Sequence, residues 1–115
     1  MPIRTGAPTA TILSGQSLSS AIKLNGGFVE GIYMPASWTA ATLSFAVSED
    51  DSTYVPLTDA LGVEMALTVA GATAIMLPLS SLRGWNYLKL RSGTSAAAVN
   101  QGADRAFTLI TRAYA

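Results

Sequence analysis

Acidic side chains are the residues of this sequence most able to do chemistry, because the chain contains no histidine and no cysteine. Glu49, Asp50 and Asp51 are consecutive, and clustered carboxylates are ligands that calcium prefers. The run lacks the regular ligand spacing of a calcium-binding loop, and Asp and Ser are also common turn formers. A plain turn is therefore the favoured interpretation and a calcium site the alternative, and we expect no cofactor.

Other carboxylates could hydrolyse a bond, since a pair of carboxyl groups can act without histidine. Those available are Glu30, Asp59, Glu64 and Asp104, and the sequence shows no pairing among them. Serine is abundant, but no Gly-x-Ser-x-Gly motif occurs, and only Lys23 and Lys89 remain as conceivable bases for a hydroxyl. Because tuned ionisable groups are what an active site requires, we expect a protein that is not an enzyme.

Charged residues are scarce, at 12% of 115 residues, while hydrophobic residues reach 50%. The length allows one domain with a modest core. The basic and acidic residues balance at 7 each, whereas a surface that binds nucleic acid needs clustered Lys and Arg. A surface so poor in charge has little protection against self-association. We therefore expect no nucleic-acid partner and a protein that assembles, in part with copies of itself.

Two long uncharged windows, residues 5–22 and 65–82, approach the length of a membrane span. The first is rich in Thr, Ser, Gly and Gln, and the second is interrupted by Gly71 and Pro78 and alternates like a strand. We expect neither window to cross a membrane. Residues 1–8 lack the apolar core of a secretory signal, so we expect synthesis in the cytoplasm without classical export.

Alternating apolar and polar residues predict the β-strands that must position these groups. Leu43, Phe45 and Val47 alternate with small or polar residues, and a second strand at residues 55–57 follows the acidic turn. This is the pattern of a β-hairpin. Pro56 lies in the second strand and cannot donate a hydrogen bond to a ladder, which places it at a sheet edge.

Similar patterns predict strands at residues 17–24, 28–34, 63–69, 75–79, 85–91 and 105–114, with residues 9–13 as a further candidate for a short edge strand. Residues 28–34 are apolar on both faces, so this strand is central or bent at Gly31. We expect a second hairpin from residues 63–69 and 75–79, and a single helical turn at residues 35–41. Seven to eight strands without helical periodicity predict an all-β antiparallel sandwich over residues 11–115, preceded by an extended arm at residues 1–10. The order of the strands stays open.

One predicted strand has an outer face that could bind a partner, because Leu88 and Leu90 are expected to point to the core. The opposite face carries Trp85, Tyr87, Lys89 and Arg91, joined by Arg112 and Tyr114 if the last strand lies nearby. Aromatic and Arg side chains dominate protein interfaces, and flat aromatic rings also stack on sugars. Three interpretations stay open: burial under a neighbouring loop or sheet, a subunit contact, and a glycan or other ligand site. Trp38 is expected to anchor the connection at residues 35–41.

Three segments resemble a family of small structural proteins of tailed bacteriophages and prophages. They are SEDDSTYVPLTD at residues 48–59, GIYMPASWTAATLSF at residues 31–45 and WNYLKLRSGTSAAAVNQGADRAFTLITR at residues 85–112, and they cover most of the chain. The hairpin and the strand at residues 87–91 are also similar to the jelly-roll sandwiches of discoidin-like carbohydrate-binding domains. The phage resemblance implies a virion protein of the decoration or cement type, whose jelly-roll fold clamps neighbouring major capsid subunits.

Such a protein is located on the capsid surface, and its partners are the major capsid protein and copies of itself. The arm, with Pro2, Ile3 and Arg4, is expected to lie along a neighbouring subunit and pair with it. The alternative function is a glycan- or host-binding module of a phage tail, head fibre or baseplate. No functional residue is carried over from the family, because its members share no catalytic motif.

Overall fold

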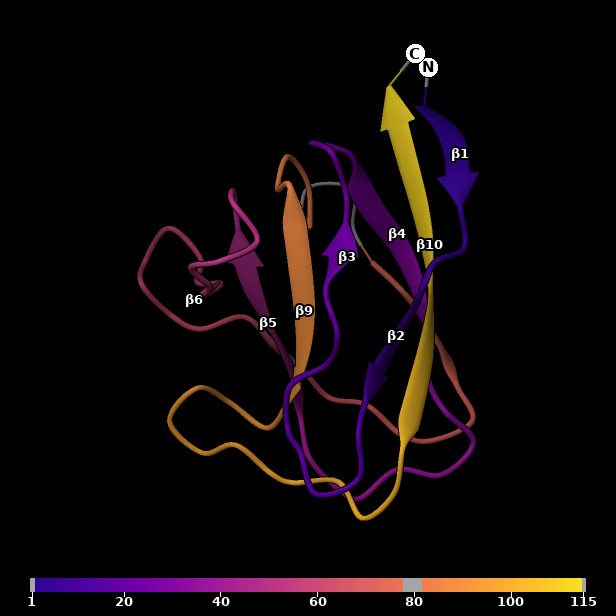
Figure 1. Cartoon of the computed structure of the whole chain (residues 1–115), viewed down its shortest axis with the longest axis vertical. Helices are drawn as coiled ribbons and strands as arrows, with labels where there is room; N and C mark the ends of the chain where they lie inside the picture. The colour runs from indigo at the N-terminus through magenta and orange to yellow at the C-terminus, as the bar shows by residue number, and fades with distance from the viewer. Residues whose placement is uncertain (1, 78–81, 115) are drawn as a thin grey trace.

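The structure of the chain, a computed structural model, describes residues 2–77 and 82–114, with the backbone alone at residues 2–5, 113 and 114. It is an antiparallel β-sandwich of two five-stranded sheets, and Figure 1 shows the two layers side by side. The predicted all-β sandwich is confirmed. The described part of the chain contains no helix, and so none that could cross a membrane.

Each sheet draws its strands from both halves of the chain. The first sheet consists of β1 (Pro2–Gly6), β2 (Thr9–Ile12), β4 (Phe28–Tyr33), β8 (Ala74–Met76) and β10 (Arg105–Tyr114). The second consists of β3 (Ile22–Lys23), β5 (Leu43–Ser48), β6 (Val55–Pro56), β7 (Ala66–Leu67) and β9 (Tyr87–Ser92). Pro56 pairs with β5 alone, so its predicted place at a sheet edge is confirmed.

The strand order is that of a jelly roll. β1 and β2 share one side of β10, because Thr108 pairs with Thr9 on that side and with Tyr33 of β4 on the other. β6 and β7 likewise share one side of β5. The ten strands therefore fill eight positions. We number these positions along the chain. Across one sheet they then follow in the order 1, 8, 3, 6, and across the other in the order 2, 7, 4, 5, which is the jelly-roll arrangement.

The hydrophobic core lies between the two sheets. Phe107 and Leu109 of β10 face Leu88 and Leu90 of β9, and Phe45 of β5 lies among them, all fully buried in one cluster. Each large apolar side chain buried in this way contributes roughly 1.5–3 kcal/mol to folding. The core therefore joins the two sheets and holds their outer faces in fixed positions.

A β-bulge in β4 lets this strand bury side chains that simple alternation places on opposite faces. Gly31 pairs with Ile110 and Val29 pairs with Thr111, so Glu30 is the extra residue. The inserted residue reverses the alternation, and Val29 and Ile32 both enter the core. The predicted bend at Gly31 thus lies one residue away, at Glu30, and β4 is central, as expected.

The second predicted hairpin is wrong. β7 pairs with β5 and β8 pairs with β4, so the two strands belong to different sheets. The turn between them, with Ala72 at φ 58°, passes the chain from one sheet to the other. Alternation identifies a strand but not its partner, which is why the sequence pattern suggested a hairpin. The predicted end of the second strand, Leu79, lies outside the described residues.

The predicted helical turn at residues 35–41 is also wrong, because this segment consists of bends. Trp38 anchors it instead, as expected for this side chain. Its indole Nε1 donates a hydrogen bond of 3.1 Å to the carbonyl of Ala41, and its ring packs edge-to-face on Phe107 with the centroids 5.5 Å apart. Packing on the core thus replaces the hydrogen bonds of a helical turn.

Within the expected arm at residues 1–10, the described strand residues 2–6, 9 and 10 pair with the chain's own last strand. In β1, Pro2 pairs with Tyr114 and Arg4 with Arg112. β2 begins before the predicted boundary, and its residue Ala10 is fully buried. The described segment that can separate from the sandwich without opening the core therefore ends at Gly6.

Gln101 lies in the connection between β9 and β10, which Figure 1 shows at the end of the sandwich opposite the termini. This side chain is 1% exposed. It donates hydrogen bonds of 2.7 Å to the Ser92 hydroxyl and 3.1 Å to the Thr39 carbonyl. It accepts bonds of 2.9 Å from the Thr39 N–H and 3.0 Å from Arg105 Nε. Its backbone also bonds to Gly15 and Gln16, so one residue connects four segments.

Candidate functional site

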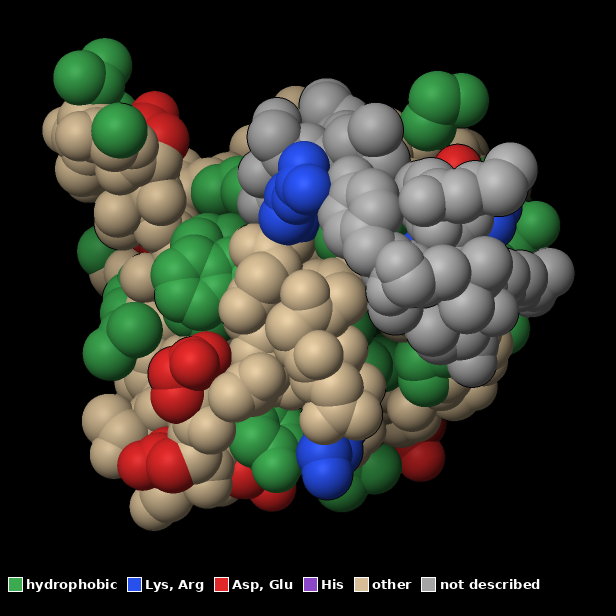
Figure 2. Space-filling model, turned by 90° about the horizontal axis from the view of Figure 1, so that it is seen from above, with side chains coloured by type: hydrophobic (Ala, Val, Ile, Leu, Met, Phe, Trp, Pro, Cys, Tyr) green, Lys and Arg blue, Asp and Glu red, His purple; other side chains and the backbone are tan. Residues whose placement is uncertain are grey.

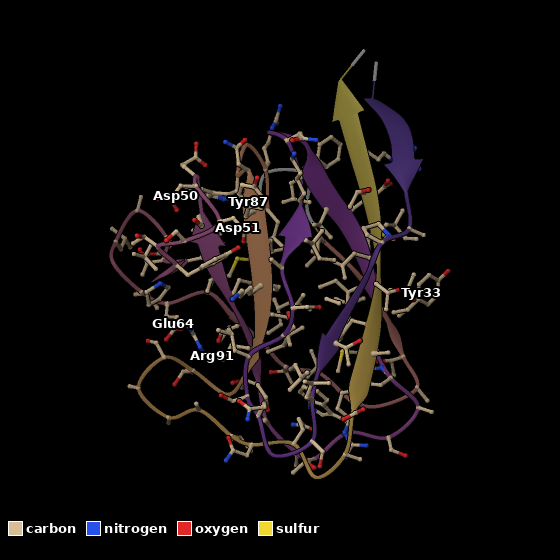
Figure 3. All side chains as sticks on the ribbon, viewed as in Figure 1. Tyr33, Asp50, Asp51, Glu64, Tyr87 and Arg91 are labelled. Carbon is tan, nitrogen blue, oxygen red and sulfur yellow. The ribbon has the colours of Figure 1, made fainter. Side chains whose placement is uncertain are left out.

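The outer face of β9 carries three of the predicted site residues. Tyr87, Lys89 and Arg91 are half-buried, whereas Leu88 and Leu90, which alternate with them, are buried. The predicted orientation of this strand is confirmed, since successive side chains point to opposite faces. Figure 3 shows Tyr87 and Arg91 on the same side of the molecule as Asp50, Asp51 and Glu64.

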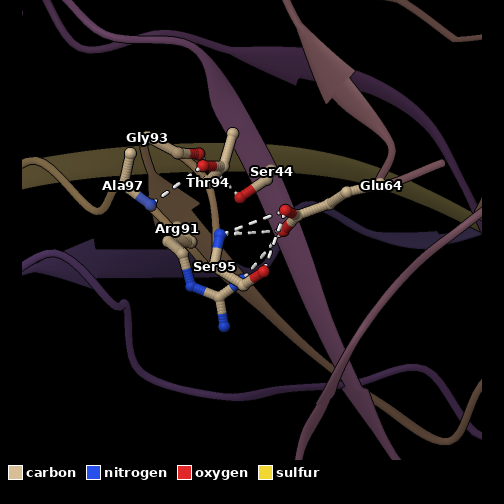
Figure 4. A network of polar contacts seen from close by, with 7 residues as sticks. All are labelled: Ser44, Glu64, Arg91, Gly93, Thr94, Ser95 and Ala97. Atoms are coloured by element: carbon tan, nitrogen blue, oxygen red, sulfur yellow. Dashed lines mark hydrogen bonds and ion pairs between the residues drawn. The ribbon is translucent and has the colours of Figure 1, made fainter.

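Arg91 is held by Glu64, which precedes β7. Its Nη1 atom lies 3.3 Å from Glu64 Oε2, and the two side chains are only 14% and 18% exposed. Glu64 also accepts hydrogen bonds of 3.0 Å from the Ser95 N–H and 2.9 Å from the Ser95 hydroxyl, as Figure 4 shows. The Arg91–Glu64 pair therefore holds the segments that contain Glu64 and Ser95 against the second sheet. The charge of Arg91 is paired and largely buried.

Lys89 is covered by the segment that follows the acidic turn. Its Nζ atom lies 4.4 Å from the centroid of the Tyr54 ring, a cation–π contact. The Tyr54 hydroxyl donates a hydrogen bond to the Asp51 carboxylate. Burial, and then the neighbouring Asp51 carboxylate, raise the pKa of Tyr54 far above its ordinary value. The Lys89 and Arg91 side chains thus lie beneath connecting segments, whereas the burial interpretation was made for Trp85 and Tyr87.

The acidic turn is organised by Asp50. Its Oδ1 atom accepts hydrogen bonds of 2.9 Å from the N–H groups of Thr53 and Ser52 and from the Ser48 hydroxyl. These bonds, first that from Thr53, lower the pKa of the exposed Asp50 carboxyl group. The described residues include no group of three or more acidic side chains placed to hold a metal ion. Asp50 therefore closes the turn of the predicted hairpin, and β5 and β6 form its strands.

The four carboxylates considered for hydrolysis each have a separate structural partner. Glu30 pairs with Arg112, Glu64 with Arg91, Asp59 Oδ1 accepts the Leu61 and Val63 N–H groups, and Asp104 Oδ1 accepts the Ser14 N–H. Of the two lysines considered as bases, Lys89 makes the cation–π contact with Tyr54. Lys23 is exposed on β3 and pairs with Tyr87 of β9. These contacts stabilise turns and sheets. Asp59 and Glu64 also line one surface hollow, where each carboxylate is held by its own partner.

Arg112 does not join the β9 stripe, because β10 belongs to the other sheet. It forms an ion pair with Glu30 of β4. Tyr114 also lies on β10, and the backbones of Pro2, Ile3 and Arg4 lie beside it in β1. Pairing across the first sheet thus brings the predicted arm residues next to the end of β10 and separates them from Tyr87, Lys89 and Arg91.

The outer face of the first sheet contains an apolar surface that the sequence interpretation missed. Tyr33 on β4 is 54% exposed and Met76 on β8 is 88% exposed. With Ile110 they line a shallow hollow of about 350 Å³, and the Glu30–Arg112 pair also lines it. Figure 3 shows Tyr33 pointing away from the sandwich, on the side opposite Arg91. The available signal was the apolar character of both faces of residues 28–34.

Trp85 precedes β9 and differs from Trp38. It packs partly against the core, but its indole N–H has no acceptor in the part of the chain that the structure describes, and no buried polar side-chain atom there lacks a partner. The Trp85 N–H group therefore reaches the surface, whereas that of Trp38 is bonded to Ala41. Trp85 therefore offers a hydrogen-bond donor that no described residue uses.

Comparisons with protein families, with curated proteins and with solved structures find no match to this chain.

Proposed function

We propose that this chain is a non-enzymatic virion structural protein that binds the outer surface of a phage capsid and stabilises it, with the major capsid protein as its partner. The resemblance of residues 31–45, 48–59 and 85–112 to phage structural proteins supports this proposal. The jelly-roll strand order supports it as well, since a rigid sandwich can bridge neighbouring subunits without changing shape.

The observation that carries the proposal is the apolar outer face of the first sheet. Tyr33, Met76 and Ile110 offer an aromatic ring, a flexible thioether and an aliphatic group in one shallow hollow. Aromatic and Met side chains are enriched at protein interfaces. The charged groups at this hollow, Glu30 and Arg112, already neutralise each other. A partner can therefore cover this face without burying an unpaired charge.

The test compares the wild-type chain with a Tyr33→Ser, Met76→Ser variant in co-sedimentation with capsids that lack the protein. We expect about tenfold weaker binding or more, because truncating central interface side chains costs roughly 1–4 kcal/mol. Leu61→Ser is the matched control. Leu61 is also apolar and 89% exposed, but it lies in the connection between β6 and β7, away from this surface. Equal binding by the wild type and the double variant contradicts the proposed surface.

A second experiment tests the location of the protein. Quantitative mass spectrometry of purified virions is expected to find the chain in a copy number that matches a capsid lattice. Its absence from heads, or a few copies confined to tails, contradicts the decoration function.

A deletion of residues 1–6 tests the arm. It leaves β2 and the buried Ala10 in place, so we expect a folded sandwich. If β1 leaves β10 to pair with a capsid subunit, the truncated chain binds more weakly. Unchanged capsid occupancy by a folded truncated chain shows that β1 is only an edge strand of this molecule.

A further inference from the structure

Trp85 lies between two surface hollows. The first, of about 270 Å³, is lined by Trp85 with Val47, Val55, Ser48, Thr53, Glu49 and Asp50. The second, of about 510 Å³, lies toward the segment at residues 57–66, and Met65, Asp59, Glu64 and Arg83 are part of its lining. Together these volumes fall in the range of roughly 300–1,000 Å³ that small-molecule sites occupy. One tryptophan thus lines both hollows.

The lining combines one large aromatic ring with hydrogen-bond acceptors. In the first hollow, Asp50 uses Oδ1 to close the turn, and its Oδ2 atom accepts no hydrogen bond from the described residues. Glu49 is held by Asn86 through bonds of 3.3 and 3.4 Å, which are long for charge-assisted bonds. The Trp85 N–H has no acceptor among the described residues. The site therefore offers free acceptors, a free donor and an apolar ring face.

These features match a sugar ring better than other small ligands. The C–H face of a pyranose packs on an indole ring, and its hydroxyl groups both donate to carboxylates and accept from N–H groups. Acidic side chains line both hollows, and Arg83 is the basic residue among the described linings. Figure 2 shows this end of the molecule, with acidic side chains gathered at the lower left. The resulting negative field disfavours an anionic ligand.

We propose that Trp85 is the platform of a binding site for neutral oligosaccharides, with sugar rings in the hollows on its two sides. Glu49 and Asp50 accept hydrogen bonds from sugar hydroxyl groups in the first hollow, and the Trp85 N–H donates one. This site lies on the other sheet from the Tyr33 and Met76 surface, and its function does not depend on capsid binding.

The chain contains two tryptophans, so tryptophan fluorescence can report on the site once Trp38 is replaced. In a Trp38→Phe variant, the fluorescence comes from Trp85 alone. We expect maltotriose, cellotriose or triacetylchitotriose at millimolar concentration to shift or quench this emission with saturation, and trigalacturonate to have a much smaller effect. Saturation-transfer NMR on the wild-type chain measures the same binding, so the result does not depend on the stability of the variant.

Variants then locate the site. Trp85→Leu is expected to abolish saturation transfer, and Glu49→Gln to weaken binding severalfold while leaving the fold unchanged, because Glu49 is exposed. Tyr33→Ser, on the opposite sheet, is the control and is expected to bind as the wild type does. The proposal is overturned if none of the three neutral trisaccharides binds, if trigalacturonate binds equally well, or if folded Trp85→Leu and Glu49→Gln both keep full affinity.

Discussion

Replacing Gln101 with alanine tests whether one buried side chain holds the loop end of the sandwich. Gln101→Ala removes two donated and two accepted side-chain hydrogen bonds. It also leaves the hydroxyl of the fully buried Ser92 without its donor. Each such bond is worth about 0.5–1.5 kcal/mol net, and an unsatisfied buried group costs more. We therefore expect a loss of about 3–4 kcal/mol in the free energy of unfolding.

This loss is large for a chain of 115 residues, whose total stability is of the order of 6–17 kcal/mol. Chemical unfolding in urea, followed by far-ultraviolet circular dichroism, measures it directly. In a thermal scan it corresponds to a decrease in Tm of roughly 10–15 °C.

Gln16→Ala is the matched control, because Gln16 is exposed and bonds to Gln101 through its backbone alone. We expect a change within about 0.5 kcal/mol. If Gln101→Ala is no more destabilising than Gln16→Ala, the network does not hold these connections together, and the inference from the hydrogen bonds is wrong.

Three further predictions concern the loop that covers the second sheet. In a spectrophotometric titration, we expect Tyr54 to ionise well above its ordinary pKa of 10.0, because burial and the Asp51 carboxylate raise that pKa. Its contribution to stability is therefore complete below pH 10 and is lost as the pH rises above it. Ionisation of Tyr54 near pH 10 contradicts the Asp51 contact. Asp50 has a lowered pKa, so its contribution to stability is present above the ordinary pKa of 3.8 and is lost as the pH falls below it. We therefore expect Asp50→Asn to weaken the pH dependence of stability on the acid side. An unchanged pH dependence argues against the turn as its source. Glu64→Ala leaves Arg91 without its ion-pair partner and should cost about 2–3 kcal/mol in urea unfolding, whereas a loss below about 0.5 kcal/mol shows that solvent replaces the carboxylate.

The half-buried strands could be predicted from sequence because their pattern is local. β10 has the predicted bounds, residues 105–114, since Phe107 and Leu109 alternate with residues that face outward. The hairpin at residues 43–57 was also identified, because an acidic turn follows the alternation of Leu43, Phe45 and Val47. In both cases the side chains that define the strand are the side chains that fill the core.

The burial of polar side chains could not be predicted from sequence. Gln101 lies in a segment rich in Ala, Gly and Asn, and nothing in its neighbours distinguishes it from an exposed residue such as Gln16. The partner of Arg91, Glu64, is 27 residues away and belongs to another strand connection. Such contacts depend on the strand order, which alternation leaves undetermined.

The exposed apolar surface was missed for the same reason. Residues 28–34 were seen to be apolar on both faces, but the outer neighbours of Tyr33 are set by the pairing of β4 with β8 and β10. Sequence spacing alone therefore could not place Met76 and Ile110 beside Tyr33. It also left open whether the last strand lies near β9, and the strand order places Arg112 and Lys89 on different sheets.

The central place of the last strand has a consequence for synthesis of the protein. β10 is the pairing partner of both β1 and β2, so these two strands have no neighbour in the sheet until residues 105–114 leave the ribosome. At about 5–20 residues per second, the N-terminal strands wait several seconds with unpaired edges. The first sheet is therefore completed only when β10 emerges, in a slow step dominated by contacts between distant residues. A chain that ends before β10 keeps only the β4–β8 pair of this sheet.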